Sequence, residues 1–398
     1  MKITMISNYI NHHQIPFSEE LYHRLGDGYK FIQTEPMEEE RIQMGWQVEE
    51  DKIPYLVLLE KEEEKCRQLI KDSDILLIGW NEREDLFCER LGSKKLTFRV
   101  SERIYREGQW KAISPKGLIR KYQEHIRYRK NPVYLLCAGA YVPSDFSLIR
   151  AYPDKMLRFG YFPEFNRYSE EQLIKNHPWG EKKGEKEISL VWAGRFLPLK
   201  HPEMAVQLAF DLKKEGYSFH LHMIGNGQME EELKHMTREK GLEKEITFYG
   251  FLPPMEVRKI MEKSHIHLFT SNHLEGWGAV VNEAMNCGCA EVVNSEVGAA
   301  GFLIRHQKNG LVYKKGDYEN FLAMVTSLFE NPKKGESLGN MAYRTISEHW
   351  NAKEAAERLL DFYENWKKGR VILPEEGPFS KAPVISSSKM YDYICGDV

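Results

Sequence analysis

Short apolar runs alternate with longer amphipathic or charged stretches along most of the chain. Residues 75–78, 188–193 and 266–269 are runs of this kind, and each has the length and composition of a buried strand. Stretches between the runs, such as residues 205–212, repeat apolar residues at helical spacing. Strands that alternate with helices predict an α/β fold in which the sheets are mostly parallel.

A polar, charged and glycine-bearing stretch, residues 167–186, divides this pattern into two halves and is a candidate domain boundary. We expect a first domain at residues 1–165 and a second at residues 186–350. An amphipathic helix is expected at residues 351–370, and residues 371–398 form a tail that either wraps around the fold or is disordered. The predicted strands are residues 2–7, 29–33, 55–59, 75–79, 96–100, 133–137, 156–162, 188–193, 219–224, 246–251, 266–269 and 290–294.

The composition is that of a soluble globular protein, with 42% hydrophobic and 29% charged residues. The net charge of −3 gives no sign of a nucleic-acid partner. The chain begins with a strand pattern rather than a signal peptide, and no apolar run reaches transmembrane length. The six cysteines are scattered, without the spacing of a disulfide framework or a metal site. We therefore expect a cytoplasmic protein without a bound metal.

The stretch from residue 273 to residue 285 has the composition of a ligand site. It follows the predicted strand 266–269, and its glycines, Gly276 and Gly278, allow a sharp turn and a close approach of the backbone to a ligand. From about Ala279 the pattern is helical, and the free N–H groups at the start of a helix can bind an anion. The stretch therefore predicts a site for a phosphate group.

Two carboxylates bracket this turn, Glu275 within it and Glu283 in the second turn of the helix. A carboxylate in either place can accept hydrogen bonds from paired hydroxyls of a ribose or a hexose. The alternative is a solvated helix face that follows an ordinary turn. The motif Glu-Gly-Trp-Gly-x4-Glu-Ala-Met, followed by Cys287-Gly288, resembles the E-x7-E signature of retaining glycosyltransferases, particularly of family 4. The resemblance implies a donor site that includes Gly276, Trp277, Gly278, Ala279, Val280 and Glu283, with Glu275 on the donor sugar.

A second cationic loop follows the predicted strand 188–193. Gly194 opens it, and Arg195 and Lys200 lie five residues apart, so that both side chains can reach one diphosphate. This loop resembles the G-R-x4-K loop of family 4, which implies that the arginine and the lysine stabilise a departing diphosphate. The alternative is a pair of surface cations.

Two further turns lie at the carboxyl ends of predicted strands. Gly225-Asn226-Gly227 follows residues 219–224, although such a turn alone is a weak signal. Residues 249–251 end the next predicted strand, and the resemblance implies that the backbone at Tyr249 contacts a nucleobase. The alternative is that this aromatic cluster belongs to the core.

The first half offers acceptor-side candidates. Asn11, His12 and His13 follow the first predicted strand, at the edge of a doubly wound sheet where ligands bind. The two histidines could face a substrate, or they could cap the next helix and face solvent. Glu102 follows the strand 96–100 and could be a base or a ligand of the acceptor hydroxyl, or it could pair with Arg103 or Arg106.

Residues 111–130 are locally basic, with seven lysines and arginines against Glu124 alone. Apolar residues recur in this stretch at helical spacing, at Leu118, Ile119, Tyr122 and Ile126. Such a helix can lie on an anionic membrane surface, or it can be a solvated helix whose apolar stripe packs in the core.

The resemblance implies a GT-B fold, with two Rossmann-like doubly wound domains that face a central cleft and a last helix that crosses back to the first domain. It implies transfer of a sugar, with retention, from a nucleotide-diphosphate sugar to an acceptor hydroxyl without a metal ion. We favour a UDP-sugar over a GDP-sugar as donor. A saccharide or lipid-linked acceptor would suit surface polysaccharide or glycoconjugate synthesis by an enzyme that is cytoplasmic, either free or associated with the membrane. The alternatives are a catalytically silent GT-B partner protein and a GT-B epimerase or phosphorylase.

Overall fold

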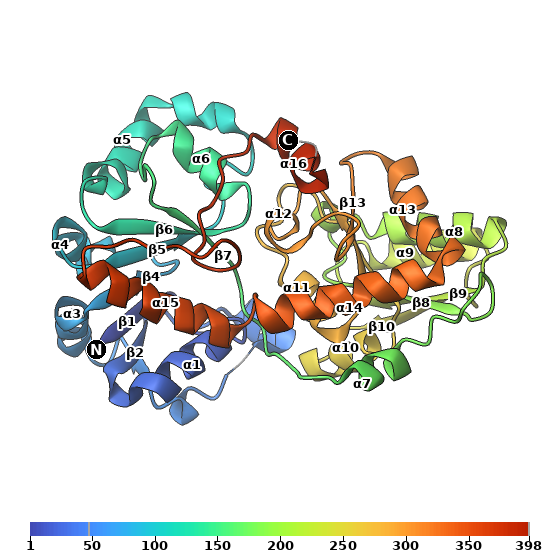
Figure 1. Cartoon of the computed structure of the whole chain (residues 1–398), viewed down its shortest axis with the longest axis horizontal. Helices are drawn as coiled ribbons and strands as arrows, with labels where there is room; N and C mark the ends of the chain where they lie inside the picture. Colours follow the sequence, from blue (N-terminus) through green and yellow to red (C-terminus); the bar gives the residue numbers. More distant parts are fainter. Residues whose placement is uncertain (47, 397–398) are drawn as a thin grey trace. The chain divides into compact units, whose positions relative to one another are not determined.

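The computed structural model describes residues 1–46 and 48–396, so Gln47, Asp397 and Val398 lie outside the described part. The chain divides into two compact units (Figure 1). The first unit comprises Met1–Glu164 and Trp350–Ile385, and the second comprises Phe165–His349 together with the described residues from Ser386 onward. Residues 166–185, which the prediction left between its domains, belong to the second unit, and the predicted crossing helix lies in the first.

The first unit contains a parallel sheet of seven strands in the order β3-β2-β1-β4-β5-β6-β7. The strand order reverses between β1 and β4, which makes this sheet doubly wound. Its strands are β1 Ile3–Ser7, β2 Tyr29–Gln33, β3 Leu56–Leu58, β4 Ile75–Ile78, β5 Thr97–Ser101, β6 Val133–Ala138 and β7 Met156–Phe159. Its helices are α1 Ile15–Leu25, α2 Glu39–Arg41, α3 Glu63–Asp72, α4 Cys88–Gly92, α5 Pro115–Glu124, α6 Val142–Leu148 and α15 Ala352–Lys367.

The second unit contains a parallel sheet of six strands in the order β10-β9-β8-β11-β12-β13, and this order reverses between β8 and β11. Its strands are β8 Ile188–Ala193, β9 Phe219–Ile224, β10 Ile246–Gly250, β11 Ile266–Phe269, β12 Ala290–Asn294 and β13 Leu311–Tyr313. Its helices are α7 Glu170–Asn176, α8 Glu203–Lys214, α9 Glu230–Glu239, α10 Pro254–Met261, α11 Ala279–Cys287, α12 Ala300–Leu303, α13 Tyr318–Glu330, α14 Pro332–Glu348 and α16 Met390–Cys395.

The apolar pattern of the sequence explains these elements. All four residues of β4 and all four of β11 are buried, as expected for strands covered on both faces. The predicted stripe of α8 is also buried, at Ala205, Leu208, Ala209 and Leu212. The predicted fold class, two Rossmann-like doubly wound sheets, is confirmed. The cleft expected between the two units stays a prediction.

Several stretches differ from the expectation, among them β13, which was not among the predicted strands, and β7, which ends at Phe159 instead of residue 162. Helix α14 was not predicted, because its sequence is polar and contains Gly335 and Gly339. Residues 36–50, for which no strand or helix was predicted, contain the short helix α2 and a π turn at Ile42–Trp46, with Gln47 outside the described residues. The start of the predicted tail is ordered and wraps along β7, where the N–H of Phe379 donates to Arg158 O at 2.8 Å. Its last two residues, Asp397 and Val398, are not described.

Across the described residues, no helix has the length and apolar character needed to cross a membrane.

Candidate active site

The candidate donor residues gather where the strand order of the second sheet reverses. The loop after β8 carries Gly194 to Lys200, and the loop after β11 carries residues 270–278. β8 and β11 are neighbours in the sheet, with His267 opposite Val191, so both loops leave the same carboxyl edge. A crevice outside this edge is the usual ligand site of a doubly wound sheet.

An ion pair joins the two loops, because the Lys200 ammonium contacts a carboxylate oxygen of Glu275. Both side chains are largely buried, with 16% and 15% of their surface exposed. The loop backbones are fixed to each other as well: Thr270 Oγ1 donates to Lys200 O at 2.6 Å, and the N–H of Asn272 donates to Leu199 O at 2.9 Å. The sequence predicted each residue separately, and the structure shows that Lys200 and Glu275 are partners.

The start of α11 lies against the same group of residues. Gly278 has a φ of +89°, and a Cβ at this position would lie 2.8 Å from the ring of Phe269. The Lys200 Nζ lies 5.6 Å from the centroid of that ring. No hydrogen bond among the described residues engages the N–H of Ala279 or Val280. A cation and two available N–H groups therefore lie close together, which is the arrangement that binds an anion.

The glycine turn after β9 packs directly on the loop after β8. A Cβ on Gly225 would lie 1.9 Å from Gly194 O, and a Cβ on Gly227 would lie 2.6 Å from Phe196 O. Their φ values of +133° and +152° also favour glycine. The N–H of Phe196 donates to Asn226 O at 2.7 Å. Gly225 and Gly227 thus hold the loop that carries the candidate cations, whereas Asn226 is exposed.

Arg195 and Glu283 differ in their surroundings. Arg195 is exposed on its loop. Glu283 is largely buried on α11, and burial raises the pKa of its carboxyl to about 7, an effect that the nearby Arg258 and His267 oppose. Glu283 therefore changes its charge state close to neutral pH.

Trp277 has a structural side chain. Its indole is 1% exposed and donates from Nε1 to Asn282 Oδ1 at 2.7 Å. Because the ring is buried in the core, only the backbone of Trp277 can contact a donor. The prediction that Trp277 belongs to the donor site is therefore limited to its backbone.

Tyr249 is not a core residue, so the alternative interpretation of residues 249–251 is wrong. Tyr249 and Phe251 are 36% and 44% exposed. The Tyr249 hydroxyl lies 2.8 Å from His222 Nδ1, and burial lowers the pKa of His222 to about 4. The next residue, Gly250, accepts a hydrogen bond from Gly225 N–H, which brings this segment to the glycine turn.

The acceptor-side candidates lie at the corresponding edge of the first sheet. The side chain of Asn11 does not cap α1. Its Oδ1 accepts a hydrogen bond from His13 N–H at 3.0 Å. The rings of His12 and His13 lie 3.9 Å apart, and Trp46 packs edge-on against both. Burial lowers the pKa of His12 to about 4, so this ring is neutral at pH 7. The interpretation of the pair as a solvent-facing helix cap is wrong.

A chain of contacts connects this histidine pair to Glu102. The ring of Tyr161 stacks on His13 at 5.7 Å, and the Tyr161 hydroxyl donates to Glu102 Oε1 at 2.7 Å. Glu102 also pairs with Arg106, which confirms one of its two interpretations. No local pattern in the sequence marks Tyr161 or Trp46, because both contacts depend on the folded chain.

Trp80 is a further residue that the prediction missed. It lies two residues after the end of β4, next to the loop after β1, and its side chain is 74% exposed. Its backbone is fixed, since Trp80 O accepts from the N–H of Asn8 at 2.5 Å and from Ser7 Oγ at 3.2 Å. An aromatic residue directly after a predicted strand was the signal available in the sequence.

Comparison with known proteins matches residues 174–345 to the family described as glycosyl transferases group 1. Spore coat protein SA of Bacillus subtilis (strain 168) is 24% identical over 184 residues, which are 44% of this chain and 48% of that protein. The amylovoran biosynthesis glycosyltransferase AmsK of Erwinia amylovora is 26% identical over 182 residues, 44% of each chain. The chain thus spans about half the length of the curated relatives it matches.

Solved structures match over nearly the whole chain. Anabaena Alr3699/HepE in complex with UDP superposes with a TM-score of 0.66 and 13% identity, covering 91% of this chain and 99% of that one. The lipopolysaccharide outer core galactosyltransferase WaaB in its apo form gives 0.63 and 15%, covering 92% and 100%. At these identities the matches show the fold, which is the GT-B fold.

Proposed function

We propose that this chain, whose residues 174–345 match the group 1 glycosyl transferases, transfers a sugar from a nucleotide-diphosphate sugar to an acceptor hydroxyl. The observation that supports the proposal most directly is the ion pair of Lys200 and Glu275 beside the start of α11. It combines a cation for phosphate with a carboxylate for sugar hydroxyls at one edge of the sheet.

In the proposed reaction the bond between the anomeric carbon and the diphosphate breaks, and negative charge grows on the leaving group. Lys200, Arg195 and the N–H groups at the start of α11 would stabilise that charge where it develops. An ammonium has three protons, so Lys200 can donate to Glu275 and to a phosphate oxygen together. We propose that these groups supply the positive charge without a metal ion.

The two carboxylates would have separate roles. Glu275 would accept hydrogen bonds from the donor sugar, and Glu283 would accept them from the ribose. For a retaining reaction we propose that the acceptor attacks from the face that the diphosphate leaves. The departing phosphate oxygen would take the acceptor proton, so no protein nucleophile is required.

A UDP-sugar is the proposed donor. Support comes from the similar Anabaena Alr3699/HepE structures, which are complexes with UDP, with UDP and glucose, and with UDP-glucose. In this chain Gly225 to Gly227 and the backbone at Tyr249 would lie beside the nucleotide.

The proposed acceptor is a saccharide, free or lipid-linked, bound at the carboxyl edge of the first sheet. Trp80 offers an exposed ring on a fixed backbone, and an aromatic face can stack on a sugar ring. The neutral His12 and the paired Glu102 add hydrogen-bonding groups at the same edge. A lipid-linked acceptor would bring residues 111–130 to a membrane surface. A role in polysaccharide synthesis is consistent with the relative named for amylovoran biosynthesis.

The test is nucleotide release from a panel of UDP-, GDP- and ADP-sugars, with and without a water-soluble saccharide acceptor. We expect release from one donor class, strongly reduced in Lys200→Ala. The matched control is Lys213→Ala, because Lys213 pairs with Glu245 on the same unit, outside the proposed donor site. Binding of nucleotide without release, with every acceptor tried, would favour a silent partner protein. If the protein neither bound any nucleotide sugar nor released nucleotide from one, the proposed donor site would be refuted.

A further inference from the structure

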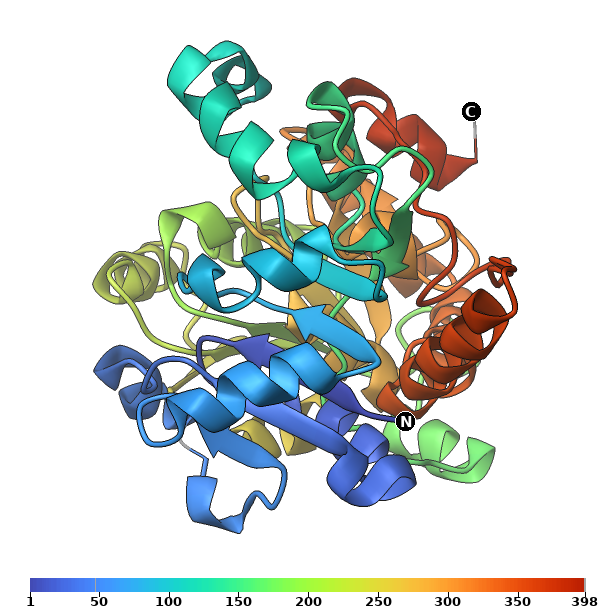
Figure 2. The same ribbon diagram turned by 90° about the vertical axis from the view of Figure 1, so that its left-hand side faces the viewer.

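Helix α5 has an unusual orientation on the first unit. Ser114 caps it, since Ser114 Oγ accepts from Gly117 N–H, and Pro115 is its first residue. None of its ten residues, all of which the structure describes, is buried. Figures 1 and 2 show this helix, in teal, standing away from the seven-stranded sheet.

The two faces of α5 are reversed relative to an ordinary surface helix. The partly covered residues are Gly117, Lys121 and Glu124, at the spacing of one helical face. The apolar residues of the helix point to solvent instead. An amphipathic helix of a soluble domain normally buries its apolar stripe and exposes its charges. The interpretation of this stripe as core is therefore wrong.

The preceding 3₁₀ turn, Gln109–Ile113, extends the exposed apolar surface. The complete group, here called the α5 surface, consists of Trp110 (70% exposed), Ile113 (80%), Leu118 (40%), Ile119 (62%) and Tyr122 (57%). Ile126, which the sequence suggested as part of the stripe, is partly buried and does not belong to it. A contiguous group of large exposed apolar side chains indicates an interaction site.

Cations surround the α5 surface. Residues 107–130 contain seven lysines and arginines and two glutamates, in a chain whose net charge is −3. Glu124 pairs with Arg120 and Lys121, and Glu107 pairs with Lys111. Lys116 and the exposed Arg127, Arg129 and Lys130 add to the excess. The stretch that carries the α5 surface is therefore locally basic, although the chain as a whole has a net charge of −3.

We infer that the α5 surface docks onto an anionic lipid bilayer. Apolar side chains on one helical face enter the headgroup boundary, and flanking lysines and arginines stay at the lipid phosphates. A tryptophan and a tyrosine in this group suit the membrane–water interface, where such rings are enriched. A protein partner could also cover apolar side chains, but the excess of exposed cations in the same segment complements anionic lipid.

The inference specifies the membrane contact named under the proposed function. Only the biological use of docking, which is access to a lipid-linked acceptor at the membrane, rests on the proposed function. Docking is independent of the transfer chemistry at Lys200 and Glu275. The two can therefore be tested separately in the same full-length protein.

The experiment is co-flotation of the whole chain with vesicles of phosphatidylcholine, with or without phosphatidylglycerol, in the absence of donor and acceptor. We expect binding only to the anionic vesicles, and weaker binding as salt concentration rises. The triple variant Trp110→Ser, Ile113→Ser and Ile119→Ser should bind at least about tenfold more weakly. The variant Lys116→Gln should lose about fivefold on anionic vesicles.

The matched control is Ile174→Ser with Ile372→Ser, because these isoleucines are 52% and 56% exposed elsewhere on the chain. This control should bind vesicles like the unchanged protein. All variants replace exposed residues, so their melting temperatures should agree. The triple variant should keep nucleotide release with a water-soluble acceptor, which separates docking from catalysis. Absence of binding to anionic vesicles would overturn the inference. The inference would also be overturned if the triple variant bound anionic vesicles as the unchanged protein does. The same holds if the triple substitution abolished self-association of the protein and left vesicle binding intact.

Discussion

The two sheets reverse their strand order at equivalent places, between β1 and β4 in the first and between β8 and β11 in the second. The side chains at these two edges differ. In the second sheet, a largely buried ion pair, Lys200 with Glu275, joins the two loops. In the first sheet, hydrogen bonds from Asn8 N–H and Ser7 Oγ to the backbone carbonyl of Trp80 join the loops, and the Trp80 ring is exposed.

Under the proposed function, this difference would correspond to a division of labour, with the donor at the second sheet and the acceptor at the first. A fixed cation beside a helix start suits a charged leaving group, because the charges do not need to reorganise as the reaction proceeds. An exposed ring and neutral imidazoles, such as His12, suit an uncharged saccharide. The ion pair of the first sheet, Glu102 with Arg106, is more exposed, at 27% and 36% of the side-chain surfaces.

The largest expected effect comes from removing the cation of the second sheet. Lys200→Ala should lower the rate of sugar transfer by about 10²- to 10³-fold, because a preorganised donor to the leaving group is lost. Arg106→Ala should lower it by less than about tenfold, since this arginine contacts a carboxylate at the acceptor edge. Steady-state kinetics of both variants provide the measurement. Equal losses in the two variants would contradict the division of labour.

A smaller effect is expected from the ring of the first sheet. Trp80→Ala should raise the KM for a saccharide acceptor up to about tenfold, because a stacking face is lost, and should leave the Kd for a UDP-sugar unchanged. The 74% exposure of Trp80 makes a change in folding stability unexpected.

The matched control is Trp110→Ala, since Trp110 is 70% exposed but belongs to the α5 surface. With a water-soluble acceptor, this control should behave like the unchanged protein, and Trp80→Phe should recover part of the affinity. A weaker UDP-sugar affinity in Trp80→Ala would place the ring at the donor instead.

The next prediction uses the titration of Glu283. The carboxyl has a raised pKa of about 7, so the group is largely neutral below this pH and ionised above it. If the ionised form accepts the ribose hydroxyls, UDP-sugar affinity should increase about fivefold between about pH 6 and about pH 8. Isothermal titration calorimetry measures the affinity, and a UDP-sugar avoids the terminal phosphate of UDP, which titrates in the same range.

The control for this titration is Glu283→Gln, which should bind more weakly at high pH and show a flat profile. Folding stability should follow the opposite trend to affinity. A carboxyl whose pKa is raised in the fold stabilises it at low pH, and this contribution is lost as the pH rises through 7. A pH profile that persists in Glu283→Gln would assign the titration to another group.

The sequence predicts the residues at the carboxyl edge of the second sheet better than those at the edge of the first, because the positions that require glycine can be recognised in the local sequence. A Cβ on Gly225 would collide with Gly194 O, and one on Gly278 would collide with Phe269. These positions therefore require glycine, and the spacing of the glycines is visible without a structure. The strands are visible for a similar reason, since burial on both faces makes each a continuous apolar run.

Other features depend on packing between distant segments. The stack of His13 on Tyr161 joins residues from opposite ends of the segment Met1–Glu164, and no local pattern marks it. Helix α14 contains two glycines because its neighbours lie so close. A Cβ on Gly335 would lie 2.3 Å from Trp179, and one on Gly339 would lie 2.2 Å from Gly288 O. Glycines that permit close packing look like helix breakers in the sequence.

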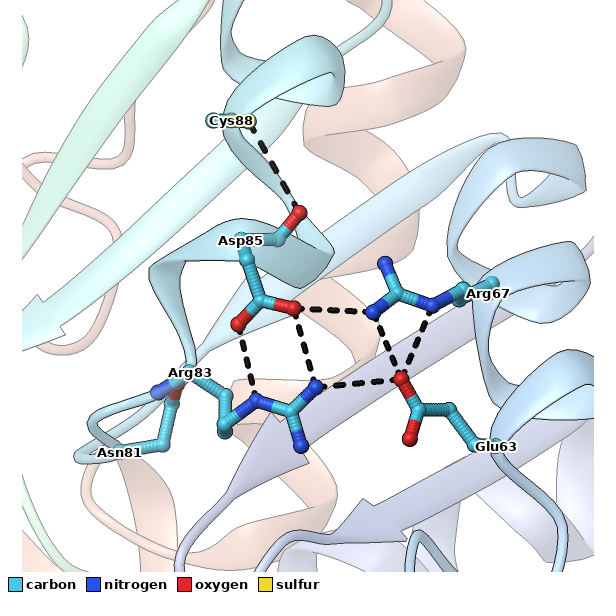
Figure 3. A network of polar contacts seen from close by, with 6 residues as sticks. All are labelled: Glu63, Arg67, Asn81, Arg83, Asp85 and Cys88. Carbon is cyan, nitrogen blue, oxygen red and sulfur yellow. Dashed lines mark hydrogen bonds and ion pairs between the residues drawn. The ribbon is translucent and has the colours of Figure 1, made fainter.

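The smallest expected effect concerns the charge network of Figure 3, which lies three residues beyond Trp80 and joins Arg83 and Asp85 to Glu63 and Arg67 of α3. The two arginines lower the pKa of Asp85 to about 2. Because this pKa is depressed in the fold, its stabilising contribution is present above the ordinary carboxyl range and is lost as the pH falls toward 2.

The side chains of this network are 37% to 50% exposed, compared with 15% and 16% for Glu275 and Lys200. Solvent therefore screens the network, and Asp85→Asn should lower the free energy of unfolding by less than about 1 kcal/mol and leave sugar transfer unchanged. Urea unfolding at neutral pH and at about pH 3 measures the effect, which should shrink at the lower pH. A loss of transfer in Asp85→Asn would mean that the network positions the loop of Trp80, and the acceptor edge would then depend on charge as the donor edge does.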